Sequence, residues 1–167
     1  VHDAVLMVSG KLDLTMGGAG YRDFVIEQEA HSPHYEYHLA DPLDPKSWRR
    51  SVYRFIVRSQ THPFMTSLDC ADPSMRVDKR NESVSPGQAL SLLNNGVMVT
   101  QANVFAERVK QAAGDDAAKQ VDAAYRFALG REPTADERPK LVTYVGQHGL
   151  ANLCRLLFNL NEFVFVD

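Results

Sequence analysis

The sequence predicts a mainly α fold with a small β region (α+β), in which a C-terminal antiparallel helical bundle follows a short-stranded, loop-rich region. Two capping boxes, in which Ser or Thr is followed three residues later by Gln or Glu, mark helix starts at Ser85 and Thr134. Glycines supply the ends of the helices that follow, at Gly114, Gly130 and Gly149. Ahead of these helices, apolar residues alternate over short runs, which is typical of strands.

Residues 1–84 are expected to form the loop-rich region and residues 85–167 the helical bundle, together making one compact unit. The chain opens in an amphipathic run that Gly10 ends, so residues 1–84 are expected to be truncated from a larger protein. Alternation around Phe24, and again from His34 to Leu39, predicts two short strands within residues 21–40.

The next elements follow from their end signals. Asp44 before Pro45 predicts a single helical turn over residues 45–50, and β-branched and aromatic residues then favour a strand over residues 51–58. The helix that Ser85 opens is expected to break at Asn94-Asn95-Gly96, and the one after it to end near Gly114. Further helices are predicted to start at Asp115 or Asp116, at Thr134, and at about Leu150.

Composition excludes some classes of partner. The 167 residues are 44% hydrophobic and 23% charged, with a formal net charge of −3 and a pI of about 6.1. This balance gives no bulk attraction to nucleic acid or to an anionic membrane. The apolar runs are far shorter than the roughly 20 residues that a membrane helix needs, so no membrane insertion is expected.

Several stretches spread over nearly the whole chain share one resemblance. They include the loop Asp69-Cys70-Ala71-Asp72-Pro73-Ser74, the helix start Ser85-Pro86-Gly87-Gln88 and the run Leu129-Gly130-Arg131-Glu132-Pro133-Thr134. The chain resembles the planctomycete cytochrome-c-associated C-terminal domain family (domain of unknown function 1553). The resemblance implies a periplasmic or otherwise exported parent protein, and it implies no agreed reaction.

The cysteines do not form a cofactor motif. Cys70 and Cys154 lack the spacing of a zinc site or of the Cys-x-x-Cys-His haem attachment, so haem c is expected only elsewhere in the parent protein. Cys154 lies on the apolar face of a predicted helix, which favours a buried thiol over a disulfide with Cys70.

The sharpest metal-binding pattern is His34, Glu36 and His38. On a strand these three side chains would project from one face, where they could converge on a metal ion. The favoured alternative places them on the solvated side of an edge strand.

The loop before the bundle holds the other candidates. Asp69 and Asp72, with Arg80, could share acid–base work or bind a cation, and the favoured alternative is a structural turn in which the aspartates bond local N–H groups. Four side chains could bind a sugar or a partner, one through its positive charge and three through their amides. They are Arg80, Asn81, Asn94 and Asn95.

The leading interpretation is a non-catalytic accessory or interaction domain of a larger exported multidomain protein. The expected partners are the other domains of the parent polypeptide, and carbohydrate is a further candidate; no cofactor is expected in this chain. Two alternatives stay open: a polysaccharide-acting hydrolase domain that uses Asp69 and Asp72, and a metal-binding module at His34, Glu36 and His38.

Overall fold

The computed structural model describes residues 1–27, 32–70, 76 and 85–165. Its helices are α1 (His2–Ser9), α2 (Pro63–Ser67), α3 (Pro86–Asn94), α4 (Gly96–Ala113), α5 (Ala117–Leu129), α6 (Glu137–His148), α7 (Leu150–Phe158) and α8 (Asn161–Val164). A sheet joins β1 (Val25–Glu27) to β2 (His34–Glu36), and 3₁₀ turns cover Tyr37–Leu39, Pro45–Trp48 and Ser51–Tyr53. The mainly α class with a small β region is confirmed.

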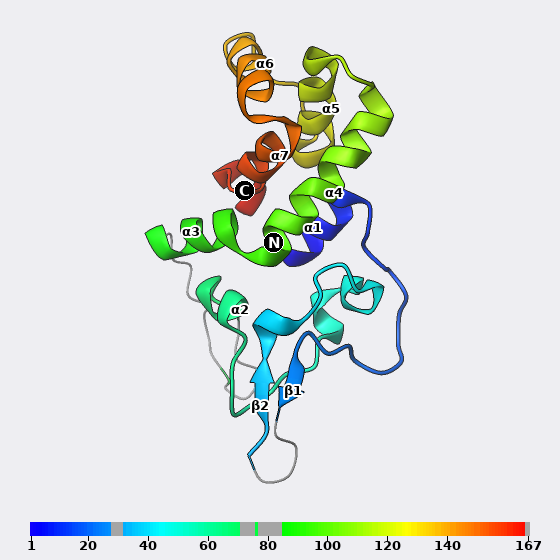
Figure 1. Ribbon diagram of the computed structural model, residues 1–167, viewed down its shortest axis with the longest axis vertical. Coiled ribbons are helices and arrows are strands. Elements are labelled where there is room, and N and C mark those ends of the chain that lie inside the picture. The colour runs from blue at the N-terminus through cyan, green and yellow to red at the C-terminus, as the bar shows by residue number, and fades with distance from the viewer. Residues whose placement is uncertain (28–31, 71–75, 77–84, 166–167) are drawn as a thin grey trace.

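Helix α4 is the centre of the helical part. Helices α1, α5 and α7 all pack against it, so the N-terminal helix of the chain joins the C-terminal helices. Figure 1 shows the sheet and its loops on one side of this group, beyond α1 and α2.

The hydrophobic core lies between α4, α5 and α7. Phe105 of α4 and Phe158 of α7 are fully buried, and their rings stack with 5.6 Å between centroids. Leu153 and Leu157 are fully buried one turn apart on α7. Burial of each such side chain stabilises the fold by roughly 1.5–3 kcal/mol.

Side-chain caps set the starts of α2, α3, α4 and α5. Ser85 Oγ accepts the amide N–H of Gln88, whose side-chain Oε1 accepts the amide N–H of Ser85, so the predicted capping box is confirmed. Asn95 separates α3 from α4 and caps α4 with its side chain. Of the two predicted candidates, Asp116 caps α5.

The two predicted short strands are confirmed as an antiparallel pair with Ile26 opposite Tyr35 at its centre. The second strand is shorter than predicted, because the chain turns into a 3₁₀ helix at Tyr37 and does not stay extended to Leu39. The Tyr37 hydroxyl donates to the Gln60 carbonyl across 2.8 Å. This long-range bond fixes the turn, and the alternating pattern could not reveal it.

The strand predicted over residues 51–58 is wrong. Ser51 begins a 3₁₀ turn, and its amide and hydroxyl both donate to Asp3 Oδ1, across 2.7 and 2.6 Å. Beyond the turn the chain forms an isolated parallel bridge to Tyr21 in place of a ladder. Val52 is 76% exposed, so the β-branched run does not cover a buried sheet face.

One helix start near the C-terminus differs from its prediction, and a break follows α7. Thr134 and Glu137 exchange both bonds of the capping box, at 2.7 and 3.2 Å, but the regular helix begins only at Glu137 because the intervening residues form a turn. Helix α7 ends at Phe158, after which Leu160 is extended. This break lets Phe163 of α8 pack its ring against Phe158, with 5.3 Å between centroids.

The glycine-rich segment before β1 is a loop held in place by side-chain hydrogen bonds. The Arg49 guanidinium donates to the carbonyls of Thr15, Gly17 and Ala19. A Cβ on Gly20 would lie 2.7 Å from the Tyr53 carbonyl oxygen, closer than real atoms approach. Glycine is therefore required at position 20 for close backbone contact.

Candidate functional site

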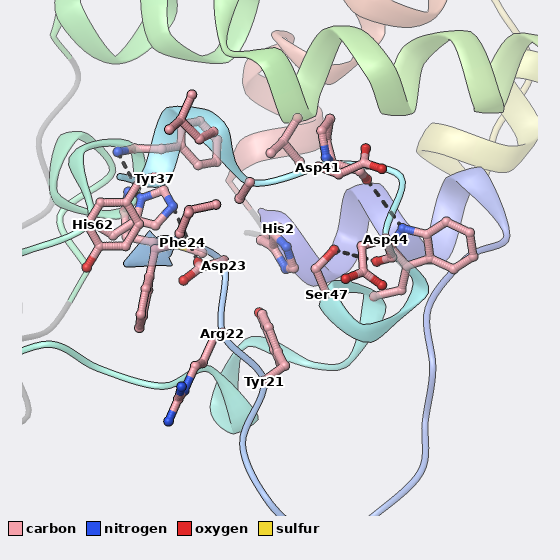
Figure 2. Close-up of a pocket in the computed structure, with 18 of the residues that line it drawn as sticks. His2, Tyr21, Arg22, Asp23, Phe24, Tyr37, Asp41, Asp44, Ser47 and His62 are labelled. Atoms are coloured by element: carbon pink, nitrogen blue, oxygen red, sulfur yellow. Dashed lines mark hydrogen bonds and ion pairs between the residues drawn. The ribbon is translucent and has the colours of Figure 1, made fainter. Parts of the chain in front are cut away.

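A pocket of about 350 Å³ lies where the N-terminal region meets the first turns of α4. Its walls come from α1, the segment leading into β1, the turns before Trp48, the start of α2, and Val97 and Gln101 of α4. Figure 2 shows Asp23 between His62 and His2, three residues from distant parts of the chain. The volume falls at the lower end of the range of about 300–1,000 Å³ for ligand pockets.

Asp23 is the central carboxylate of the pocket wall, with 15% of its side chain exposed. Its Oδ2 lies 3.4 Å from His62 Nε2 and 3.9 Å from Arg54 Nη1. Burial raises the pKa of Asp23, and the positive charge of Arg54 opposes that shift. A largely buried carboxyl with a raised pKa in a pocket is typical of functional sites.

His62 is held as a neutral imidazole in one tautomer. Its Nδ1 accepts the amide N–H groups of Phe64 and Met65, across 3.2 and 3.4 Å, and so caps α2, a helix that sequence analysis missed. Nε2 therefore carries the proton and points it at Asp23. Burial, followed by the positive charge of Arg54, lowers the pKa of His62 to about 4.

His2, Asp3 and Ser51 form a second polar group beside the pocket. His2 Nδ1 lies 3.1 Å from Asp3 Oδ1 and 3.0 Å from Ser51 Oγ, and Ser51 Oγ donates to the same Asp3 oxygen. Although burial acts in the opposite direction, the hydrogen bonds from His2 and Ser51 hold the pKa of Asp3 well below its usual range. Serine hydrolases place Asp and Ser on opposite imidazole nitrogens, so this trio does not form a catalytic triad.

Two buried polar atoms of the pocket wall have no hydrogen-bond partner among the residues that the structure describes. They are the Tyr21 hydroxyl oxygen and Asp23 Oδ1. Tyr21 is 6% exposed, and burial, followed by the negative charge of Asp23, raises the pKa of its phenol. An unsatisfied buried polar atom costs about 1–3 kcal/mol. A ligand that supplied the missing bonds would recover part of that cost.

Several aromatic side chains line the pocket. Phe24 is buried and makes an edge contact with Tyr37, with 5.6 Å between centroids. Tyr37 also packs on the His62 ring at 4.5 Å. Trp48 lines the pocket as well, and its indole N–H donates to the Pro42 carbonyl across 3.4 Å. These contacts hold the rings in place around the polar groups.

Asp41 and Asp44 add two further carboxylates to the pocket lining (Figure 2). Asp41 Oδ1 accepts the amide N–H of Leu43 across 2.8 Å, and Asp44 Oδ1 accepts that of Lys46 across 3.0 Å. The second bond caps the single turn predicted after Asp44, which is the 3₁₀ turn Pro45–Trp48. Both bonds are local Asx turns that fix the orientation of the carboxylates.

The predicted metal ligands do not share a strand face. His34 and Glu36 lie on β2, but the strand ends at Glu36 and His38 belongs to the following 3₁₀ turn. Glu36 Oε2 lies 3.2 Å from His38 Nδ1. Over residues 1–27, 32–70, 76 and 85–165, no three His, Cys, Asp or Glu side chains gather in a way that could hold a metal ion.

Asp69 is half-buried just after α2, whereas the other loop candidates, Asp72, Arg80 and Asn81, lie outside the described residues. The backbone of Asp69 has a φ of 54°, in the left-handed region that Asp tolerates better than most residues. Its Oδ2 accepts a hydrogen bond from Gln88 Nε2 across 2.9 Å. Asp69 therefore joins the end of α2 to the start of α3.

Asn94 and Asn95 border an open surface hollow of about 440 Å³, which shares Phe64 with the lining of the Asp23 pocket. Asn94 Oδ1 accepts a hydrogen bond from Arg155 Nη2 across 2.8 Å, and Asn95 Oδ1 accepts the amide N–H of Val97. Both side chains thus hold the junction between α3 and α4, and a role in binding stays a prediction.

Cys70 and Cys154 do not form a disulfide, which confirms the favoured prediction. Cys154 is fully buried in α7, and burial raises the pKa of its thiol far above the usual range. Cys70 is exposed near the end of α2. Cys154 therefore acts as a small core side chain.

The family model for PSD1, a protein of unknown function (DUF1553), matches residues 1–145 of the chain. The chain belongs to this family. No curated protein and no solved structure matches it. The match to the DUF1553 model spans the whole pocket lining, from His2 to Gln101. Within the described part of this DUF1553 chain, every helix is too short or too polar to cross a membrane.

Sequence analysis of this DUF1553 chain missed the pocket residues. Two signals were available: Asp23 places a charge inside the apolar alternation before β1, and His62 stands before Pro63, where a helix cap is expected. Neither signal indicates that the two side chains meet. Only the folded chain brings His2, Asp23 and His62 to one pocket.

Proposed function

We propose that this DUF1553 chain is a non-catalytic accessory domain of a larger exported protein, and that it acts by binding a small polar molecule in the Asp23 pocket. One observation carries the proposal: the Tyr21 hydroxyl and Asp23 Oδ1 are buried in the pocket wall without partners in the described parts of the chain. Buried polar atoms are normally satisfied, so orphaned ones on residues that line a cavity indicate where a ligand bonds.

His62 is arranged for binding and not for general base catalysis. A general base needs an unprotonated nitrogen within reach of the substrate, but the acceptor nitrogen of His62 is occupied by two backbone amides of α2. His62 Nε2 carries its proton towards Asp23. The pair is thus arranged to orient and stabilise a bound group.

Exposed apolar side chains in the N-terminal region support contact with other domains of the parent polypeptide. Leu14, Met16 and Val52 are 59%, 77% and 76% exposed. Export of the parent protein, and haem c in another of its domains, rest on the resemblance to the planctomycete cytochrome-c-associated family. Carbohydrate remains a ligand class for the pocket, since hydroxyl groups can bond both orphaned atoms and sugar rings stack on aromatic walls.

Fluorescence of Trp48 tests the proposal directly. Trp48 is the single tryptophan of the chain and lines the pocket, so its emission reports occupancy there. The test titrates the protein with a panel of small amines, neutral sugars and carboxylates. We expect a saturable change in emission with at least one class.

Two substitutions provide the matched controls. Ala40→Phe places a ring in the pocket lining and should abolish the response, whereas Ala112→Phe changes an exposed position on α4 and should preserve it. Melting temperatures establish that both variants fold. A flat titration with every class, or a response that survives Ala40→Phe, would disprove binding in the pocket.

A further inference from the structure

The pocket presents mainly hydrogen-bond acceptors. His2 Nδ1 contacts the Asp3 carboxylate and the Ser51 oxygen, whose hydrogen already points to Asp3, so Nδ1 must carry the imidazole proton. When the imidazole is neutral, its other nitrogen, Nε2, is then an acceptor. Asp23 Oδ1 is a buried acceptor with no partner within the described residues. A complementary ligand must therefore donate hydrogen bonds.

The fixed charges around the pocket are negative on balance. Asp23, Asp41 and Asp44 line it, against the guanidinium of Arg22. The Arg54 guanidinium also lies 3.9 Å from Asp23, which leaves three carboxylates against two guanidinium groups. This excess of negative charge favours a cation over a neutral or anionic ligand.

The aromatic walls favour the same kind of group. Tyr37, Phe24 and Trp48 line the pocket, and the faces of such rings attract cations. Tyr21 places an orphaned hydroxyl in the wall, which can accept a hydrogen bond from a ligand. Carboxylates, an acceptor imidazole and aromatic faces together match a group with several N–H donors, no acceptor and a positive charge.

We infer that the ligand of this pocket carries a primary ammonium group, held by Asp23 and His2 against the aromatic walls. An ammonium has three donors and no acceptor, which suits the acceptor-rich lining. The inference rests on the proposed binding function and names its ligand class. A free alkylamine and a lysine side chain of a partner present the same chemistry to the pocket.

The test compares cationic probes with related uncharged and anionic probes by Trp48 fluorescence. The probes are 1-aminobutane, 1-butanol and butyrate, together with Nα-acetyl-lysine methylamide and its Nε-acetylated form. We expect the two amines to saturate the response at concentrations at least tenfold lower than their uncharged or anionic counterparts. Tighter binding of the lysine derivative than of 1-aminobutane indicates a partner's side chain, and the reverse indicates a free amine.

Charge variants localise the binding. Asp23→Asn keeps the shape of the side chain and should weaken amine binding at least tenfold, whereas Asp115→Asn removes the same charge at a site 91% exposed and should change it less than twofold. His2→Phe is a second pocket variant, expected to weaken amine binding. Saturation by butanol, butyrate or sugars as tight as by the amines overturns the ammonium assignment and leaves the proposed binding function standing. If no probe changes the Trp48 emission, the ammonium assignment and the proposed binding function are both wrong.

Discussion

His62 Nε2 lies 3.4 Å from Asp23 Oδ2, and the same imidazole caps α2 through Nδ1. One side chain therefore fixes the start of a helix and the central carboxylate of the pocket at once. Because both nitrogens are engaged, protonation of His62 would remove the cap while it strengthened the attraction to Asp23. The two residues couple local helix stability to the protonation state of the pocket.

The stability of the protein should depend on pH through His62. Its folded pKa of about 4 lies below the ordinary value of 6.5, so the unfolded chain binds the extra proton between these limits. The contribution of His62 is fully present above about pH 6.5 and is lost as pH falls through about 4. We expect His62→Asn, which can still cap α2, to remove a slope of up to about 1.4 kcal/mol per pH unit in this window. Denaturant unfolding from pH 4 to 7 measures it.

Asp23 acts in the opposite sense and supplies the control. Its raised folded pKa contributes stability that is present at low pH and lost as pH rises through that pKa. Asp23→Asn should therefore steepen the net rise of stability with pH, whereas His62→Asn flattens it. Identical pH profiles for wild type and His62→Asn would show that His62 does not titrate in this way.

Ser85→Ala should destabilise the fold by about 1 kcal/mol, because the amide of Gln88 loses its acceptor at the start of α3. The matched control is Ser59→Ala, a change at an exposed serine in a loop. Urea midpoints and slopes compare the two variants. Equal midpoints would mean that the capping box adds nothing to stability in solution.

Gly20→Ala should destabilise the N-terminal region by about 1–3 kcal/mol, since the new methyl group meets the Tyr53 carbonyl oxygen at 2.7 Å. Gly96→Ala is the control, because within the described structure a Cβ at the start of α4 meets nothing within 4 Å. Alanine also raises helix propensity there, so a neutral or stabilising effect is expected. Thermal unfolding of both variants measures the contrast, and equal losses would contradict the close contact at Gly20.

The sequence predicts the helical half well because its signals are local. The cap at Ser85, the break at Asn95 and the stop at Gly130 depend on residues a few positions away. The failed strand after Ser51 depends instead on Asp3, which lies 48 residues earlier in the chain and binds the Ser51 amide. Hydrophobic periodicity and residue propensity do not reveal long-range hydrogen bonds of this kind.

Predictions for the candidate site divide in the same way: local features follow from the sequence, and long-range contacts do not. The 3₁₀ turn that Asp44 caps is local, and the residue pair with Pro45 predicts it. The pocket itself needs His2, Asp23 and His62 to converge, and no spacing rule joins residues so far apart. The strand face expected to carry His34, Glu36 and His38 together does not form, because that expectation assumed a strand that the long-range hydrogen bond of Tyr37 cuts short.

Asp69→Asn should leave stability nearly unchanged, whereas Asp69→Ala should cost about 1–2 kcal/mol. Asparagine tolerates a φ of 54° and keeps an oxygen for Gln88 Nε2, but alanine loses the hydrogen bond and strains the backbone. Urea unfolding separates the two variants. A hydrolase that used Asp69 would show a different pattern, with activity on polysaccharides lost in Asp69→Asn at full stability.

Removal of one hydroxyl from each of two tyrosines should have opposite effects. Tyr21→Phe deletes a buried hydroxyl that has no partner within the described chain, so we expect unchanged or increased stability, by up to about 1 kcal/mol. Tyr37→Phe deletes the donor to the Gln60 carbonyl and should cost about 0.5–1.5 kcal/mol. Thermal and urea unfolding of the ligand-free protein provide the measurement.

A stabilising Tyr21→Phe that also weakens the Trp48 response to ligand would mark the hydroxyl as retained for binding at the expense of stability. A loss of stability as large as that of Tyr37→Phe would show that Tyr21 already has a partner in the free protein.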